Sequence, residues 1–289
     1  MPLVLPFPNI DPALFSIDIG SFTFSLRWYA LAYLAGLLIA LWMMVRLMKK
    51  PALWPANTPP MDPEKPESLL TWCVFGVILG GRLGFVAFYQ PAYYLQHPNE
   101  ILQVWNGGMS FHGGFIGVIL ATYFFAKLHK IPLIQLADAV AIVAVPGLLL
   151  GRLANFINGE LWGRTTDVSW AMVFPHGGPD PRHPSQLYQA GLEGLALLLI
   201  LLYLAHRRGW LKRPGMITGV FFIGYGLARA FVENFREPDG QFITPDNPAG
   251  HVIRLTSDLG FTMGQTLSLP MIAIGLGFWA YSRRASAPA

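Results

Sequence analysis

Residues 133–164 read LIQLADAVAIVAVPGLLLGRLANFINGELWGR, a long apolar segment that ends in a polar run. About 20 predominantly apolar residues cross the roughly 30 Å hydrocarbon core of a bilayer as an α-helix. Segments of this length and character recur along the chain, at 26–48, 68–89, 109–128, 133–155, 185–205, 215–235 and 264–282. The sequence therefore predicts an all-α polytopic membrane protein with seven transmembrane helices, forming a single transmembrane domain over residues 1–289.

The composition favours this class over a soluble all-α protein with seven buried helices. Hydrophobic residues make up 53% of the chain and charged residues 12%, whereas soluble proteins have about 25% charged residues. No lysine or arginine precedes Arg27, so the first 20 residues lack the basic start of a cleavable signal peptide and should remain attached. Cys73, the single cysteine, excludes an internal disulfide and a cysteine metal cluster.

Basic residues distinguish the two sides of the predicted membrane domain. Twelve follow the odd-numbered spans: Arg46, Lys49, Lys50, Lys65, Lys127, Lys130, Arg207, Arg208, Lys212, Arg213, Arg283 and Arg284. The other side holds five: Arg27, Arg164, Arg182, Arg236 and Arg254. Because cytoplasmic loops are enriched in Lys and Arg, we expect the N-terminus outside and the C-terminus in the cytoplasm. Two outer loops, about 156–184 and 237–263, should form a small extramembrane head rich in turns.

Three arginines, Arg82, Arg152 and Arg229, lie inside or at the end of apolar segments, all toward the outer side in this orientation. An arginine within hydrocarbon costs about 3 kcal/mol or more and persists where it is paired or solvated in a cavity. Three at one depth predict an anionic site that opens toward the outer leaflet. For Arg82, pairing with a carboxylate and binding of a lipid headgroup are both open.

The run GRLANFINGELWGR at 151–164 is the densest polar stretch. Arg152 and Asn155 share a helical face, and a guanidinium offers a planar fork that suits phosphate. Gly159 and Gly163 would let the backbone turn closely under a ligand. The alternative is interfacial anchoring by Arg152 and Trp162, which is common at membrane edges.

A second polar stripe, in ARAFVENFREPD, places Arg229, Glu233 and Arg236 on one helical face. Glu233 is either a structural partner that neutralises a buried arginine or a group that takes or orients a proton. His112, in NGGMSFHGGF, is a candidate base, with a hydrogen-bonded packing role as its alternative. Tyr29 is either an interfacial anchor or a hydroxyl donor to a phosphate. No Walker loop, zincin motif or G-x-S-x-G elbow is present, and we expect no metal, cofactor or nucleic-acid partner.

Taken together, six runs resemble the bacterial phosphatidylglycerol–prolipoprotein diacylglyceryl transferases. They are RWYALAY, GGRLGFVAFY, WNGGMSFHGG, GRLANFINGELWGR, RHPSQLYQ and ARAFVENFREPD, in order over residues 27–239. The resemblance implies seven transmembrane helices in the bacterial cytoplasmic (inner) membrane and an active site toward the periplasmic leaflet. It also implies transfer of the sn-1,2-diacylglyceryl group from phosphatidylglycerol to the lipobox cysteine of a prolipoprotein signal peptide, the first step of lipoprotein maturation.

Carried onto this chain, the family's essential positions are Tyr29, His112, Arg152, Asn155, Gly163 and Arg229, and Glu160 and Glu233 match further functional positions. Phe85 and Gln189 depart from the family pattern, so a catalytic role for either is doubtful. We expect Arg152, Arg229 and Asn155, with Gly163, Glu160 and Arg82, to bind the lipid phosphate, and His112 to act as the base. The rival classes are a lipid transporter or flippase, which the one-sided polar cluster disfavours, and an intramembrane serine protease, which the missing elbow disfavours.

Overall fold

The computed structural model of the chain describes residues 5–8, 10–20, 22–256 and 259–285. They fall into two compact units, one formed by residues 1–40 with 138–289 and the other by residues 41–137. The boundaries lie inside two helices, α1 (Trp28–Met48) and α5 (Leu133–Val143), so each of these helices contributes to both units.

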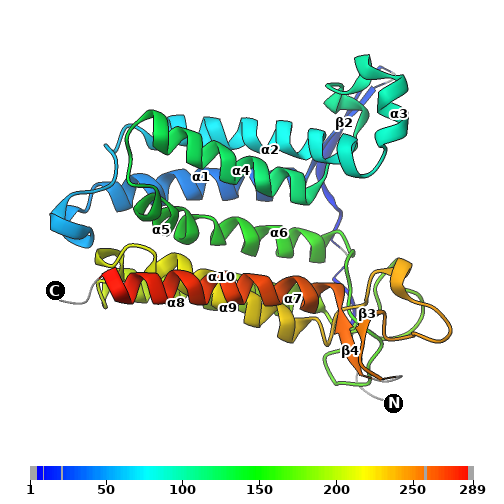
Figure 1. Cartoon of the computed structure of the whole chain (residues 1–289). Helices are drawn as coiled ribbons and strands as arrows, with labels where there is room; N and C mark the ends of the chain where they lie inside the picture. The colour runs from blue at the N-terminus through cyan, green and yellow to red at the C-terminus, as the bar shows by residue number, and fades with distance from the viewer. Residues whose placement is uncertain (1–4, 9, 21, 257–258, 286–289) are drawn as a thin grey trace. The chain divides into compact units, whose positions relative to one another are not determined.

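Helices dominate the described residues (Figure 1). Six are long and apolar enough to cross a membrane: Trp28–Met48, Pro66–Phe88, Phe111–Leu128, Leu133–Ile157, Ser185–His206 and Met263–Arg284. The seventh expected span, 215–235, is helix α9 (Met216–Val232), which has 17 residues and is shorter than the others. The structure is thus consistent with a multi-pass membrane protein, while the seventh crossing and the orientation stay predictions. Residues 1–4 and 286–289, where the chain ends lie, are outside the described residues.

Two of the long helical segments change their winding partway. The fourth consists of α5 and α6 (Val145–Ile157), and Pro146 falls in the first turn of α6, where its missing N–H costs nothing. The fifth consists of α7 (Ser185–Gln189), a π-helical stretch η5 (Ala190–Ala196) and α8 (Leu197–His206). π-helical turns are rare and occur frequently at functional sites.

Two small antiparallel sheets were not foreseen by the all-α prediction. Strands β1 (Ala13–Ile19) and β2 (Phe22–Arg27) form a hairpin that leads directly into α1. Strands β3 (His251–Arg254) and β4 (Gly260–Thr262) form a second hairpin that leads into α10 (Met263–Ala285). In the first hairpin, Ser16 and Ser25 hydrogen bond across the strands at 2.8 Å. The period-two alternation of polar and apolar residues at 13–27 is the signal that could have revealed it.

The first unit contains the two polar loops and the helices that support them. Arg164 donates hydrogen bonds to the carbonyl oxygens of Arg236 at 3.1 Å and Ala249 at 3.2 Å, and Arg182 pairs with Glu237 at 3.1 Å. These contacts join residues 158–184 to residues 235–256. The two loops therefore contact each other, and an extramembrane head stays a prediction; residues 257 and 258 lie outside the described part.

Helix α9 is fixed at its N-terminus by a buried carboxylate from α5. Asp138 is fully buried and accepts three hydrogen bonds of 2.7 Å, from Gly215 N, Thr218 N and Thr218 Oγ1. These N–H groups have no partner within the helix, and a carboxylate also interacts favourably with the positive end of the helix dipole. Farther along α9, Gly219 lies against Gly275 of α10, where a Cβ would meet backbone at 2.9 Å. Asp138 and these glycines therefore position the helix that carries Arg229.

The second unit is built on the close packing of α2 (Pro66–Phe88) and α4 (Phe111–Leu128), which run side by side in Figure 1. Glycines repeat every fourth residue on α2, at 76, 80 and 84, and meet Gly113 and Gly117 of α4. Small residues of this spacing let membrane helices approach closely.

The remaining helical elements are short. Helix α3 (Pro91–Gln96) follows α2. The 3₁₀ turns of the described residues are Pro51–Leu53, Pro55–Asn57, Pro98–Glu100, Val104–Asn106, Trp210–Lys212 and Gly240–Phe242.

The glycine contact between α2 and α4 predicts that Gly117→Ala destabilises the protein by about 1–3 kcal/mol, because the new methyl group would overlap the carbonyl oxygen of Gly76. Gly114→Ala is the matched control, since its Cβ would meet no atom closer than 3.6 Å. Thermal unfolding in detergent measures both. Equal melting temperatures for the two variants would contradict the close packing.

Candidate active site

Four of the predicted polar residues meet near the end of α6. Asn155 Nδ2 donates a 2.8 Å hydrogen bond to Glu160 Oε1, and Asn158 Nδ2 lies 3.4 Å from the same oxygen. The chain turns back between them at Gly159, whose φ of 63° is in the left-handed region that favours glycine. Tyr29, in the first turn of α1, lies within electrostatic range of Glu160 and Arg152. Tyr29, Arg152, Asn155 and Glu160 therefore form one polar group, as the sequence predicted.

Glu193 lies next to this group and is the centre of its charge balance. Its side chain is 1% exposed, and Oε2 lies 3.7 Å from Nη2 of Arg152. Arg229 is also within electrostatic range of Glu193, and Tyr225 contacts both Glu193 and Arg152. A buried carboxylate between two guanidinium groups offsets part of their mutual repulsion and of the cost of removing them from water.

Arg229 has a second carboxylate partner one helical turn away. Its Nη1 atom lies 2.7 Å from Glu233 Oε2, in an ion pair that lacks the direction of a hydrogen bond. Glu233 Oε1 faces Arg236 at 3.8 Å. Gly264, in the first turn of α10, makes room for this carboxylate, since a Cβ there would approach Glu233 Oε2 to 2.5 Å. The pairing alternative that we weighed for Glu233 thus has a direct geometric basis.

Gly163 lies where three chain segments meet. The groups that approach it closely are backbone carbonyl groups of the protein itself. Its N–H donates to the carbonyl oxygen of His183 at 2.9 Å, and the next residue, Arg164, donates to that of Phe235 at 2.9 Å. A Cβ on Gly163 would meet the His183 carbonyl oxygen at 2.6 Å and overlap that of Phe235. The glycine therefore joins the two polar loops close to α6 and α9.

His183 belongs to a hydrogen-bonded chain that links the loop at 158–184 to α7. Trp170 Nε1 donates to the Tyr188 hydroxyl at 2.6 Å, and that hydroxyl lies 3.0 Å from His183 Nδ1. The hydroxyl can accept from the indole and still donate its own proton to an unprotonated Nδ1, so the contact suits a neutral imidazole. Partial burial also lowers the pKa of His183 from its usual value. His183 is thus held as a neutral acceptor.

Two predicted site residues, Arg82 and His112, belong to the second unit. The Arg82 side chain is 1% exposed and donates to four carbonyl oxygens, those of Ile101, Gly107, Gly108 and Glu100, with Nη2 at 2.7 Å from the last. Neither alternative that we considered for Arg82, a carboxylate or a lipid headgroup, matches these contacts: it organises the loop that leads into α4. His112 is exposed in the first turn of α4, next to the N-cap Ser110, whose Oγ accepts from Gly113 N at 3.2 Å.

Sequence reasoning missed Glu193, Tyr225, Gln189 and Gly264. A single carboxylate in the middle of an apolar span is itself a functional signal, so Glu193 could have been found. Gln189, set aside because it departs from the family pattern, is fully buried near Glu193. Among the described residues, both its amide atoms and Glu193 Oε1 lack a directed hydrogen-bond partner. Gln189 ends α7, one turn before Glu193, and the π-helical turn that carries Glu193 leaves no recognisable sequence pattern.

The known proteins that are similar to this chain share one description. A family model described as prolipoprotein diacylglyceryl transferase matches residues 12–281. A protein of Ruegeria pomeroyi, named phosphatidylglycerol–prolipoprotein diacylglyceryl transferase, is 57% identical, with 100% of both chains aligned. Proteins of the same name from Roseobacter denitrificans and Rhizobium meliloti are 51% and 47% identical, each over 99% of this chain and over 100% and 96% of their own lengths.

The central position of Glu193 predicts that Glu193→Gln lowers stability, because two guanidinium groups lose their shared counter-charge. Breaking a fully buried pair costs about 3–5 kcal/mol; since the Arg152 side chain is 24% exposed, the loss should fall below that range. Glu237→Gln is the control, because its 37% exposed carboxylate pairs with Arg182 at the surface and such pairs contribute at most about 1 kcal/mol. Thermal unfolding of both variants is the measurement. An unchanged melting temperature for Glu193→Gln would show that Glu193 does not neutralise the two arginines.

The lowered pKa of His183 predicts a stability that depends on pH. The unfolded chain binds the proton more tightly than the folded one, so stability is complete above about pH 6.5 and falls as the pH drops toward the folded pKa. His183→Gln should remove this part of the acid sensitivity, whereas His176→Gln, at an exposed position in the same loop, should keep it. Melting temperatures between pH 5 and 8 are the measurement. A His183→Gln profile parallel to that of the unmodified protein would contradict the neutral assignment.

Proposed function

Because the chain belongs to the prolipoprotein diacylglyceryl transferase family and is a transferase, we propose that it transfers the sn-1,2-diacylglyceryl group of phosphatidylglycerol to the thiol of a prolipoprotein lipobox cysteine. In this reaction a carbon–sulfur bond forms at the glyceryl carbon, and the bond from that carbon to the phosphate oxygen breaks. Glycerol phosphate leaves with the bonding electrons, and the thiol proton passes to a base. The product is a thioether, and this transfer would be the first step of lipoprotein maturation.

Two arginines at one buried carboxylate support this function most directly. The Arg152 and Arg229 side chains are 24% and 16% exposed, so both are held by protein on one side and accessible on another. A phosphodiester that becomes a phosphomonoester gains negative charge, and preorganised guanidinium groups stabilise that charge in the transition state. Arg152 is the main phosphate anchor in this scheme, with Arg229 and Asn155 assisting.

The nucleophile belongs to the peptide substrate, whose thiol has an ordinary pKa near 8.5 and reacts as the thiolate. His112 is the candidate base, since a histidine can accept a proton near neutral pH. Tyr29, Glu160 and Gly163 shape the phosphate side of the site. Glu193 and Glu233 hold the arginines in place, and Arg82 orders the loop before α4, so we assign it a positioning role and not lipid binding.

The distribution of basic residues supports an orientation with the N-terminus in the periplasm and the C-terminus in the cytoplasm. In that orientation α6 and α9 carry Arg152 and Arg229 toward the outer leaflet of the bacterial inner membrane. Phosphatidylglycerol and the signal peptide, both membrane-embedded, would then reach the arginines within the bilayer plane.

Transfer of a labelled glyceryl lipid from phosphatidylglycerol to a lipobox peptide, measured with the purified protein in detergent, tests this function. A labelled thioether on the peptide cysteine is the expected product, and none should form with a cysteine-to-serine peptide. Peptide cleavage would instead indicate a protease. Lipid movement across vesicles without a covalent product would indicate a transporter.

The bidentate role of Arg152 predicts that Arg152→Lys loses roughly 100-fold in turnover although the charge is kept, because lysine presents a point charge and no planar fork. Arg254→Lys is the control, since Arg254 pairs at the surface with Asp246 at 2.9 Å and should retain turnover. Near-normal turnover of Arg152→Lys at normal protein levels would exclude Arg152 as the phosphate anchor.

A base acts mainly in the chemical step, so His112→Asn should lower turnover much more than it weakens lipid binding. Rates measured from neutral to alkaline pH separate the possible outcomes. Full recovery at high pH would mean that His112 supplies basicity alone. Unchanged activity at neutral pH would show that the base assignment is wrong.

A further inference from the structure

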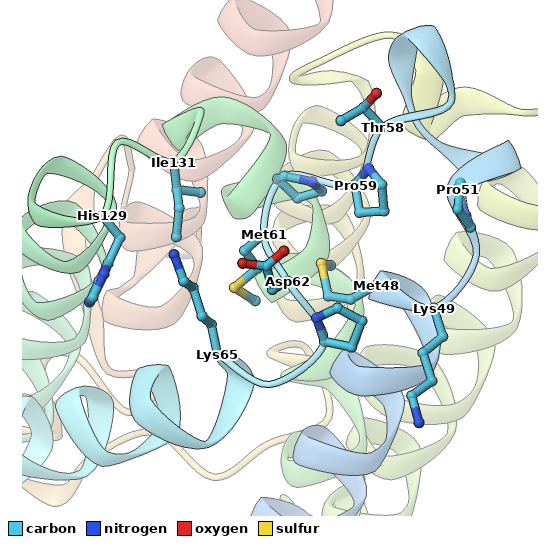
Figure 2. A pocket seen from close by; sticks show the side chains of 12 residues that line it. Met48, Lys49, Pro51, Thr58, Pro59, Met61, Asp62, Lys65, His129 and Ile131 are labelled. Atoms are coloured by element: carbon cyan, nitrogen blue, oxygen red, sulfur yellow. The ribbon is translucent and has the colours of Figure 1, made fainter.

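A cavity of about 450 Å³ lies in the second unit, where the chain passes between spanning helices. Its lining comes from the end of α1, the proline-rich loop before α2 and the residues after α4, and includes Met48, Lys49, Met61, Asp62, Lys65 and Ile131 (Figure 2). Helix α1 ends at Met48, α2 begins at Pro66 and α4 ends at Leu128. The cavity therefore lies at the level where these helices leave the hydrocarbon, on the side that the basic residues predict to be cytoplasmic.

The proline-rich loop that forms much of this cavity is folded. Trp54 is fully buried, and its Nε1 donates to the carbonyl oxygen of Leu47 at 3.0 Å. Two 3₁₀ turns, Pro51–Leu53 and Pro55–Asn57, flank this tryptophan. Met48, Met61 and Ile131 are buried as well. A fixed tryptophan and five prolines in the lining or its turns make the cavity preformed, which lowers the entropic cost of binding.

The rim of the cavity is cationic and carries one acceptor. Figure 2 shows Lys65 extending toward Ile131 and His129, Asp62 near the centre and Lys49 on the opposite side. None of the ion pairs formed by the described residues involves Lys49, Lys65 or Asp62. Two lysines and one carboxylate in the lining leave a net positive rim at neutral pH, and the carboxylate oxygens can accept hydrogen bonds from hydroxyl groups.

From this arrangement we propose that the cavity binds the phosphoglycerol headgroup of an anionic phospholipid from the cytoplasmic leaflet. The positively charged rim attracts the phosphate, and Asp62 accepts from the glycerol hydroxyls. Basic pockets between transmembrane helices on the cytoplasmic side suit such headgroups. Helix α4, which ends just before the lining residue His129, carries exposed apolar side chains, with Leu128 64% and Phe124 51% exposed, and offers a surface for acyl chains. This feature favours a lipid over a free phosphate. The cavity is separate from the arginine cluster of the first unit and goes beyond the proposed transfer reaction.

Binding of phosphatidylglycerol to the purified full-length protein, counted by native mass spectrometry, tests the proposal. The Lys49→Gln/Lys65→Gln variant should lose one bound lipid, with an affinity lower by roughly tenfold or more, because each lysine at a bilayer surface contributes severalfold. Lys50→Gln/Lys127→Gln is the matched control: it removes two exposed lysines from the same region outside the cavity and should bind like the unmodified protein. Lys49→Arg/Lys65→Arg should restore binding.

Further measurements separate the alternatives. Phosphatidylcholine should bind all variants alike, and free glycerol phosphate should not displace the bound lipid. Transfer to a lipobox peptide should be unchanged in Lys49→Gln/Lys65→Gln, so failure of the proposed enzyme activity is distinguishable from failure of this site. Unaltered lipid binding in that variant, or an equal loss in the control, would overturn the proposal. Displacement by glycerol phosphate would assign the cavity to a soluble ligand instead.

Discussion

The pairing of Arg152 and Arg229 with buried carboxylates is the interaction on which the rest of the first unit depends. Each arginine lies in an apolar helix, where an unpaired guanidinium is unfavourable by several kcal/mol. Glu193 pairs with Arg152 and lies within electrostatic range of Arg229, and Glu233 pairs with Arg229, so each cation has a buried carboxylate partner. Neither arginine side chain is fully buried, which leaves room for the phosphate contact that the proposed function requires.

The surrounding fold contains several devices that hold this cluster in position. The π-helical turn at 190–196 rotates Glu193 relative to a regular α-helix, and Asp138 fixes the start of α9 through three hydrogen bonds. Gly264 admits the Glu233 carboxylate between α9 and α10. Each of these features places a buried polar group or makes room for one. A largely apolar bundle can therefore hold fixed charges in one place.

Much of this organisation could be predicted from the sequence, and the features that could not be predicted share a physical cause. Apolar length predicted the helices at all seven expected segments, and the polar runs predicted the grouping of Tyr29, Arg152, Asn155 and Glu160. The partners of Arg82 were not predictable, because its donors bind backbone carbonyl oxygens, which every residue has. The π-helical turn and the hairpins depend on hydrogen-bond geometry that composition and helical periodicity do not report.

The most direct test of the account is the stability of Glu233→Gln, Arg229→Met and the double variant, measured by thermal unfolding alongside transfer to a lipobox peptide. Charge pairing predicts a destabilised Glu233→Gln protein, because an uncompensated buried cation can cost about 3–5 kcal/mol. The double variant should regain stability, since it removes the cation as well, while transfer stays absent. A fully stable Glu233→Gln protein with a defect in turnover alone would contradict the pairing and favour proton transfer by Glu233.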